Sequence, residues 1–219
     1  MSNKNNKPYK KSFFISGASS GLGKEFSLAV ADIAKNMIIV GRGRKKLDYV
    51  KKKILQINPE INILKIISDL STEKGLNKII TTFNKQKKIK FIDVLVNSAA
   101  NFDVKKIEKV TYRNLKDDFH INVFTPFILS KFFGLKMRRK KQGIIFNIGS
   151  SSSYESAKET SVYSSTKHAL LGMSRAFHKE WRSSGVRSIL IAPGSMKTRM
   201  GKKVKNQKYK TFINPVEVA

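Results

Sequence analysis

Three residues in the second half of the chain have the types and spacing of an acid–base centre. Tyr163 lies four residues before Lys167, and Ser150 precedes the tyrosine by thirteen residues. Because residues four apart share one face of a helix, the phenol and the ammonium would point into the same space. A free phenol, with a pKa of about 10, is a poor catalyst at neutral pH, whereas a neighbouring ammonium favours the phenolate and lowers that pKa. With the serine hydroxyl holding a carbonyl or carbinol oxygen, the set would move a proton on or off an alcohol. The tyrosine–lysine spacing alone arises easily by chance.

A glycine-rich segment near the N-terminus fits a phosphate-binding turn. The apolar residues 13–15 lead into Gly17, Gly21 and Gly23, and apolar residues at helical spacing follow. In this strand–turn–helix pattern the glycines allow a tight turn and close approach of the backbone to a pyrophosphate, which then sits on the helix N-terminus. The alternative is a flexible glycine–serine loop, but a strand and a helix flank the glycines as a dinucleotide site requires. The spacing is G-x-x-x-G-x-G rather than the commoner G-x-G-x-x-G.

The segment after the next apolar run bears on the choice of cofactor. Enzymes that choose NAD place an acid about twenty residues beyond the glycines, where it binds the ribose 2′-hydroxyl. No acid occurs in residues 37–47, and Arg42 stands at the end of the expected strand. A guanidinium suits a 2′-phosphate, which a carboxylate would repel. The sequence therefore favours NADP(H) over NAD(H), the alternative being that these cations are only surface charge.

Six apolar segments alternate with helical patterns along the chain. Besides the first strand and residues 37–40, the expected strands cover residues 62–67, 91–96, 143–148 and 186–191, and Ser71 is expected to cap a helix that ends near residue 86. This alternation predicts an α/β fold with a doubly wound parallel sheet in a single domain. Ligands of such sheets bind beyond the carboxyl ends of the strands, where all of these motifs fall.

A proline in an apolar helical segment marks one more candidate residue. The pattern predicts a largely buried helix from residue 119 to about residue 139, with Pro126 four residues after Asn122. Proline has no N–H, so the carbonyl of Asn122 would lose its helical partner and need water or a side chain. A water held there could pass protons between solvent and Lys167. The alternative is an ordinary proline kink.

Taken together, the chain resembles the short-chain dehydrogenase/reductase family over residues 12–219. The family's T-G-x-x-x-G-x-G turn matches residues 16–23, with serine for threonine, and its Y-x-x-x-K matches Tyr163 and Lys167. The N-N-A-G motif appears only as residues 97–100, with Ala100 in place of glycine. The P-G-x-x-x-T motif is complete, at Pro193, Gly194 and Thr198. The resemblance implies cofactor binding by Gly17, Ser19, Gly21, Leu22, Gly23, Arg42, Asp69, Leu70, Asn97, Ala99, Tyr163, Lys167, Pro193, Gly194 and Thr198.

The same resemblance implies reversible hydride transfer between a carbonyl or alcohol and a nicotinamide. Tyr163 would be the general acid–base, and Lys167 would tune its pKa and bind the ribose. Ser150 would donate to the substrate oxygen, and Asn122 would hold the relay water. Family members usually continue past the end of this chain with another helix and a seventh strand. Residues 186–191 are therefore expected at an open sheet edge, and a homodimer is expected through helices around residues 103–139 and 155–182.

Composition narrows the remaining classes of function. The chain of 219 residues has no cysteine, so disulfides and thiolate metal sites are excluded, and its three histidines lack metal-ligand spacing. No metal is expected. No apolar run approaches a membrane span, and residues 1–11 are polar and lysine-rich, unlike a signal peptide. We expect a cytoplasmic protein with a flexible basic tail, residues 1–11, before the single domain.

The formal net charge of +29 leaves two rival classes open. A basic nucleic-acid-binding or polyanion-binding module could retain the fold, but the lysines are spread over the chain rather than gathered in one stripe. A cofactor-sensing scaffold with little turnover is the second rival. Under the enzyme interpretation, the cationic residues 199–210 favour an anionic or carrier-protein-linked carbonyl, such as a 3-oxoacyl group, although a solvated run of charge is equally compatible.

Overall fold

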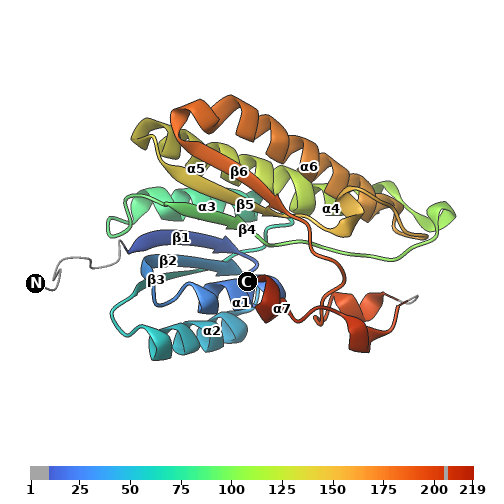
Figure 1. The fold of residues 1–219 in the computed structure, drawn as a ribbon, viewed down its shortest axis with the longest axis horizontal. Helices are drawn as coiled ribbons and strands as arrows, with labels where there is room; N and C mark the ends of the chain where they lie inside the picture. The colour runs from blue at the N-terminus through green and yellow to red at the C-terminus, as the bar shows by residue number, and fades with distance from the viewer. Residues whose placement is uncertain (1–9, 205–206) are drawn as a thin grey trace, which may run out of the picture.

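Six parallel strands form one sheet in the computed structural model, which describes residues 10–204 and 207–219. The strands lie in the order β3-β2-β1-β4-β5-β6, so the sheet grows in opposite directions from β1 and β4 (Figure 1). Their bounds are β1 (Lys11–Ser16), β2 (Ala34–Gly41), β3 (Asn62–Ile67), β4 (Val94–Asn97), β5 (Gly143–Ile148) and β6 (Val186–Ile191). This is the doubly wound sheet that the sequence predicts, and the point of reversal is where such sheets bind ligands.

Helices cover both faces of the sheet. Helices α1 and α2 lie on one face, and α3, α5 and α6 lie on the other (Figure 1). The bounds are α1 (Gly21–Ala29), α2 (Arg44–Ile57), α3 (Glu73–Lys85), α4 (Tyr112–Phe119), α5 (Thr125–Lys140), α6 (Ser161–Trp181) and α7 (Pro215–Val218). The strands carry continuous apolar runs because both of their faces are buried, as in parallel sheets generally.

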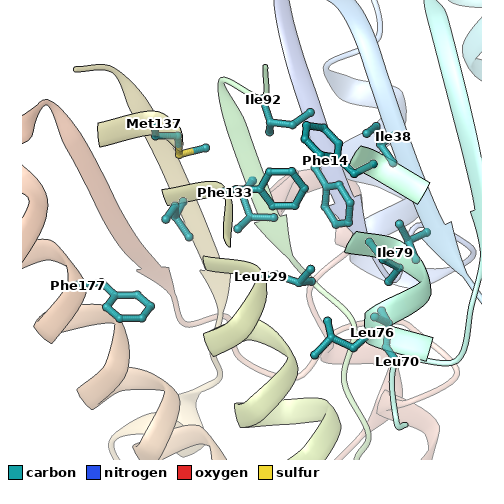
Figure 2. Packing of buried hydrophobic residues seen from close by; sticks show 14 of the residues in the cluster. Phe14, Ile38, Leu70, Leu76, Ile79, Ile92, Leu129, Phe133, Met137 and Phe177 are labelled. Atoms are coloured by element: carbon teal, nitrogen blue, oxygen red, sulfur yellow. The ribbon is translucent and has the colours of Figure 1, made fainter. Parts of the chain in front are cut away.

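Aromatic and aliphatic side chains join the sheet to the helices that carry the candidate catalytic residues. Phe14 of β1 meets Phe133 of α5 with ring centroids 4.8 Å apart, and both side chains are fully buried (Figure 2). On α6, Phe177 stacks on Trp181 at 4.5 Å with the two rings nearly parallel. Phe177 also meets Phe127 of α5 at 5.0 Å, so α5 packs on the sheet through Phe133 and α6 packs on α5.

Three local expectations differ from the structure. The N-cap of α3 is Thr72, whose hydroxyl accepts from the N–H of Gly75, while Ser71 donates to Asp69 instead. Strand β4 begins only at Val94, because the carboxylate of Asp93 takes up the N–H of Ser12. The expected continuous helix from residue 119 is a π-helical turn, His120–Phe124, followed by α5.

Strand β6 lies at the open edge of the sheet, as expected, and no seventh strand occurs in residues 10–204 or 207–219. After β6, a bridge between Met196 and Ile213 closes the base of a lid segment, which we define as residues 197–212. The short helix α7 follows and packs beside α1 (Figure 1). The expected tail falls mostly on residues 1–9, outside the described residues. None of the described helices is long and apolar enough to cross a membrane.

Two helical glycines test how tightly the core holds α5 and α6. A Cβ at Gly134 would lie 2.2 Å from the ring of Trp181, whereas a Cβ at Gly172 would meet nothing within 4 Å. Overpacking costs about 1–3 kcal/mol, against a gain of about 1 kcal/mol from replacing a helical glycine with alanine. We expect Gly134→Ala to lower the free energy of unfolding and Gly172→Ala to raise it, as measured by urea denaturation. Equal effects of the two substitutions would contradict this packing.

Candidate active site

Two adjoining cavities lie at the carboxyl ends of the strands and share Tyr163 in their walls. The first also brings together ten of the expected cofactor residues: Gly17, Ser19, Gly21, Leu22, Arg42, Asp69, Leu70, Ala99, Lys167 and Thr198. The second is lined by Ser150, Pro193 and Gly194, and by Thr198 again. Tyr163 thus stands where a cofactor site and a substrate site would meet.

Three expected site residues lie outside both cavities. Gly23 supports the glycine turn from behind, since a Cβ there would lie 2.6 Å from the carbonyl oxygen of Gly17. Asn97 is buried, and its Nδ2 donates to Asn147 Oδ1 at 2.8 Å and to Ser130 Oγ at 3.0 Å. The structure therefore places Asn97 in the core and not at the cofactor cavity, because its side chain points back between the sheet and α5. Asn122 is also buried, with 1% of its surface exposed.

The glycine turn fits the pyrophosphate of a dinucleotide. Gly17 and Gly21 adopt φ angles of 69° and 56°, which side chains rarely tolerate, and a Cβ at Gly17 would lie 2.7 Å from the backbone nitrogen of Ala99. Helix α1 starts directly after the turn, its first turn carries no acid, and the side chain of its N-cap, Ser20, makes no capping hydrogen bond. The helix N-terminus therefore presents N–H groups and a positive dipole end to an anion.

At the far end of the first cavity, Arg42 faces Asp69. The guanidinium is 72% exposed and lies 3.9 Å from the carboxylate, a weak, solvent-screened pair that leaves it able to bind another anion. Partial burial raises the pKa of Asp69, but hydrogen bonds from Ser71 and the charge of Arg42 outweigh burial and hold it below its ordinary value. Asp69 is thus an anionic acceptor beside an exposed cation.

The two residues expected to form the acid–base centre, Tyr163 and Lys167, are buried together at the start of α6. The Lys167 ammonium donates to the carbonyl of Ile148 at 2.7 Å and lies 5.5 Å from the ring centroid of Tyr163. Burial lowers the pKa of Lys167 to about 8. Burial also raises the pKa of Tyr163 above its ordinary value, and a hydrogen bond with Ser150 only partly opposes that rise. The sequence-based expectation of a lowered phenol pKa is therefore wrong for this structure, because desolvation outweighs the neighbouring groups.

The side chain of Asn122 donates both of its amide protons to protein partners and accepts one hydrogen bond. Its Oδ1 accepts from the N–H of Asn101 at 2.8 Å, and its Nδ2 donates to the Asn101 carbonyl at 2.9 Å and to Thr166 Oγ1 at 3.0 Å. The residue sits in the π-helical turn, where the N–H of Thr125 bonds the carbonyl of His120. Such turns are frequent at functional sites, and here the turn precedes Pro126.

Sequence reasoning missed several residues that line the cavities. Phe102 packs its ring edge-on against Tyr163 at a centroid distance of 4.7 Å, and Met196 and Met200 line both cavities. Phe102 follows the N-S-A-A motif by two residues, so its position after a strand end was a usable signal. The methionines come from the lid segment and the residue before it, whose path the sequence does not reveal.

Comparison with known proteins identifies the family. Residues 11–209 match the family model described as short chain dehydrogenase. The chain belongs to the short-chain dehydrogenase family. It is 32% identical over 194 residues to a very-long-chain 3-oxoacyl-CoA reductase of Caenorhabditis briggsae, covering 86% of this chain and 60% of that protein. It is 25% identical to 2-dehydro-3-deoxy-D-gluconate 5-dehydrogenase of Bacillus subtilis, covering 90% and 75% of the two chains.

Solved short-chain dehydrogenases have the same fold. A 3-oxoacyl (acyl-carrier-protein) reductase from Agrobacterium tumefaciens with NADP bound superimposes with a TM-score of 0.85 at 18% identity, over 96% of this chain and 85% of that one. A short-chain dehydrogenase from Sphingobium yanoikuyae in complex with NADPH gives a TM-score of 0.84 at 20% identity, over 95% and 80%. The chain spans 60% of the length of the nematode reductase.

The burial of Lys167 predicts a pH-dependent stability. Its folded-state pKa of about 8 lies below the unfolded value of about 10.4, so between these values the unfolded state binds more protons. The destabilisation from this group is complete below pH 8 and disappears as the pH rises toward 10.4. Relative to Lys167→Met, we expect the wild type to gain about 2 kcal/mol of unfolding free energy between pH 7 and pH 9.5.

This comparison needs a control because many other lysines titrate over the same range. Lys131→Met removes an exposed lysine from α5. The unfolding free energy of this variant, measured by urea denaturation at each pH, should change with pH in parallel with that of the wild type. Parallel profiles for all three proteins would show that Lys167 is not buried in its charged form.

Proposed function

We propose that this chain is an NADP(H)-dependent oxidoreductase that interconverts a carbonyl and a secondary alcohol, with Tyr163 as general acid–base. The observation that carries the proposal is the place of Tyr163 between two cavities, one lined by the glycine turn and Arg42 and the other by Ser150. A nicotinamide, when bound, supplies or accepts the hydride. The remaining work falls to residues of the chain.

Ser150 and Tyr163 would hold the substrate oxygen. The Ser150 oxygen accepts from the N–H of Ser152 at 3.1 Å, which leaves its O–H free to donate toward Tyr163 or a substrate. The raised pKa of Tyr163 keeps the phenol protonated at neutral pH, as an acid for carbonyl reduction requires. Lys167, with a pKa of about 8, is still mainly protonated at pH 7 and would stabilise the phenolate that proton donation leaves behind. At neutral pH both groups would thus rest in the protonation states from which carbonyl reduction starts.

For the cofactor, the exposed guanidinium of Arg42 supports a preference for NADP(H). It stands at the end of the first cavity, with Asp69 at 3.9 Å as its anionic neighbour. A 2′-phosphate would offer a stronger, bidentate partner than this loose ion pair. Two of the solved relatives were determined with NADP or NADPH bound, which agrees with this choice.

For the substrate, the second cavity supports an acyl chain attached to an anionic carrier. Phe102, Met200 and Val204 give this cavity an apolar wall. The described part of the lid segment holds Lys197, Arg199, Lys202, Lys203, Lys208 and Lys210 and no acid, and two further lid residues, 205 and 206, lie outside the described residues. A 3-oxoacyl group linked to a phosphate-bearing carrier satisfies both features. The C. briggsae relative is named for reduction of such a group.

For assembly, exposed apolar residues on α4, α5 and the turn between them support a homodimer. Tyr112, Leu115, Phe124, Phe127 and Leu135 are all exposed there. Their burial against a second copy would remove from water an apolar face that monomers seldom expose. The cytoplasmic location stays a prediction from the sequence.

The first functional prediction concerns cofactor choice. We expect NADPH to bind at least about tenfold more tightly than NADH, or about 1.4 kcal/mol, and Arg42→Asp to remove or reverse that ratio. Dissociation constants from fluorescence titration measure it. Arg44→Asp is the control. This substitution makes the same change of charge two residues away, and Arg44 lines neither cavity. Equal affinities in the wild type would contradict the assignment.

The second concerns the proton donor. Tyr163→Phe keeps the ring against Phe102 but deletes the hydroxyl, so kcat for NADPH-dependent reduction of a 3-oxoacyl thioester should fall by about 100-fold or more. NADPH binding should persist, since the glycine turn is unchanged. Tyr112→Phe, at an 81%-exposed tyrosine, should leave kcat as it is. Substantial activity in Tyr163→Phe would exclude the proposed mechanism.

A further inference from the structure

A buried carboxylate beside the site has no part in the mechanism proposed above. Asp118 lies on α4, four residues before Asn122, and only 4% of its surface is exposed. Its Oδ1 accepts one short hydrogen bond, 2.6 Å from Nδ2 of Asn101. No ion pair to Asp118 is present among residues 10–204 and 207–219. Burying this carboxylate therefore lowers the free energy of unfolding, and no ion pair offsets that penalty among the described residues.

The surroundings of Asp118 do not favour its charge. Burial raises the pKa of this carboxyl, the carboxylates of Asp103 and Asp117 raise it further, and the Asn101 bond and Lys203 oppose them. A small cavity against Asp118 also exposes it to Lys105 and Glu159. Against this cost stands the hydrogen bond that Asp118 accepts from Asn101.

That bond begins a continuous chain of hydrogen bonds to the acid–base helix. The backbone of Asn101 makes two hydrogen bonds with the side-chain amide of Asn122: its N–H donates to Oδ1 at 2.8 Å, and its carbonyl accepts from Nδ2 at 2.9 Å. The amide then donates to Thr166 Oγ1, and this hydroxyl donates to the carbonyl of Tyr163 at 2.7 Å. The residue after Asn101 is Phe102, whose ring packs on Tyr163. Asp118 therefore anchors the one loop residue that touches both Asn122 and, through its neighbour, the general acid.

We propose that Asp118 is a positioning residue that holds Asn101, and through it the amide of Asn122, in the orientation that the acid–base centre needs. The proposal rests on the oxidoreductase function proposed above. Asn101 is itself exposed, so without an anchor its side chain would turn to water and its peptide would be free to rotate away from Asn122. A buried acceptor at 2.6 Å removes that freedom.

Four variants separate positioning from simple folding. Asp118→Leu keeps the branched shape, at a greater volume, but removes the acceptor, and Asp118→Asn keeps both the size and an acceptor oxygen without the charge. Asn101→Ala removes the partner at an exposed position, where little core packing is lost. Asp117→Leu is the control, because this neighbouring carboxylate is exposed and pairs with Arg113 outside the chain of bonds.

We expect kcat to fall about tenfold or more in Asp118→Leu and Asn101→Ala, as for the loss of one buried hydrogen bond, with the NADPH dissociation constant unchanged. Asp118→Asn should recover most of kcat, and Asp117→Leu should match the wild type. The double variant Asp118→Leu/Asn101→Ala should be no slower than the slower single variant, because both delete the same bond. The proposal would be overturned if the two single losses of kcat multiplied in the double variant. It would also be overturned if Asp118→Asn recovered none of the kcat that Asp118→Leu loses. If Asp118→Leu does not fold, Asn101→Ala and Asp118→Asn still decide it.

A second readout does not depend on turnover. In ¹⁵N-labelled protein, the side-chain NH₂ of Asn122 should exchange slowly with solvent, because both of its protons are donated to protein partners. Exchange should accelerate in Asp118→Leu and Asn101→Ala and stay slow in Asp118→Asn and Asp117→Leu. Unchanged exchange in the first two variants would overturn the positioning role. Faster exchange in a protein that reduces no carbonyl would instead reject the proposed oxidoreductase function and leave the positioning role standing.

Discussion

The hydrogen bond from the Lys167 ammonium to the carbonyl of Ile148 is the contact on which the site depends. It joins α6 to the last residue of β5 and holds a charge where water cannot easily reach. A buried ammonium is tolerated only while strand and helix keep their spacing, since the carbonyl is the hydrogen-bonding partner that replaces water. Phe177 of α6 packs against Phe127 of α5, and Phe177 and Trp181 belong to the buried cluster between the helices and the sheet, which helps to keep that spacing.

Beneath the site, a second set of buried polar groups ties the strands together. Asn147 of β5 accepts from Asn97 of β4 and donates to Ser188 of β6 and Ser174 of α6. Because these bonds form only when the three strands are in register, they align the strand ends that carry the cavity walls. Oδ1 of Asn97 has no partner among the described residues, a place that a buried water would suit.

Charge acts differently at the two ends of the site. At the end that holds Tyr163 and Lys167, desolvation raises the pKa of the phenol and lowers the pKa of the ammonium, which widens the gap between the two values. At the other end, Arg42 is exposed and its ion pair with Asp69 is screened by solvent, so the guanidinium stays accessible to an anion while its charge contributes to the lowered pKa of Asp69. The lid segment adds Lys203, which donates to the Phe102 carbonyl at 2.7 Å and so links the lid to the loop that packs on Tyr163.

The sequence by itself determined the parts that depend on local pattern. The apolar runs of the strands, the glycine turn at residues 17–23 and the tyrosine–lysine spacing are short-range features, and each predicted its place at the carboxyl edge of the sheet. Residues far apart in the chain were decided only by the tertiary structure. It turned Asn97 into the core, paired Asn101 with Asp118 and Asn122, and raised the pKa of Tyr163 through burial. Desolvation and hydrogen-bond partners depend on which segments meet in space, and spacing along a chain does not encode that.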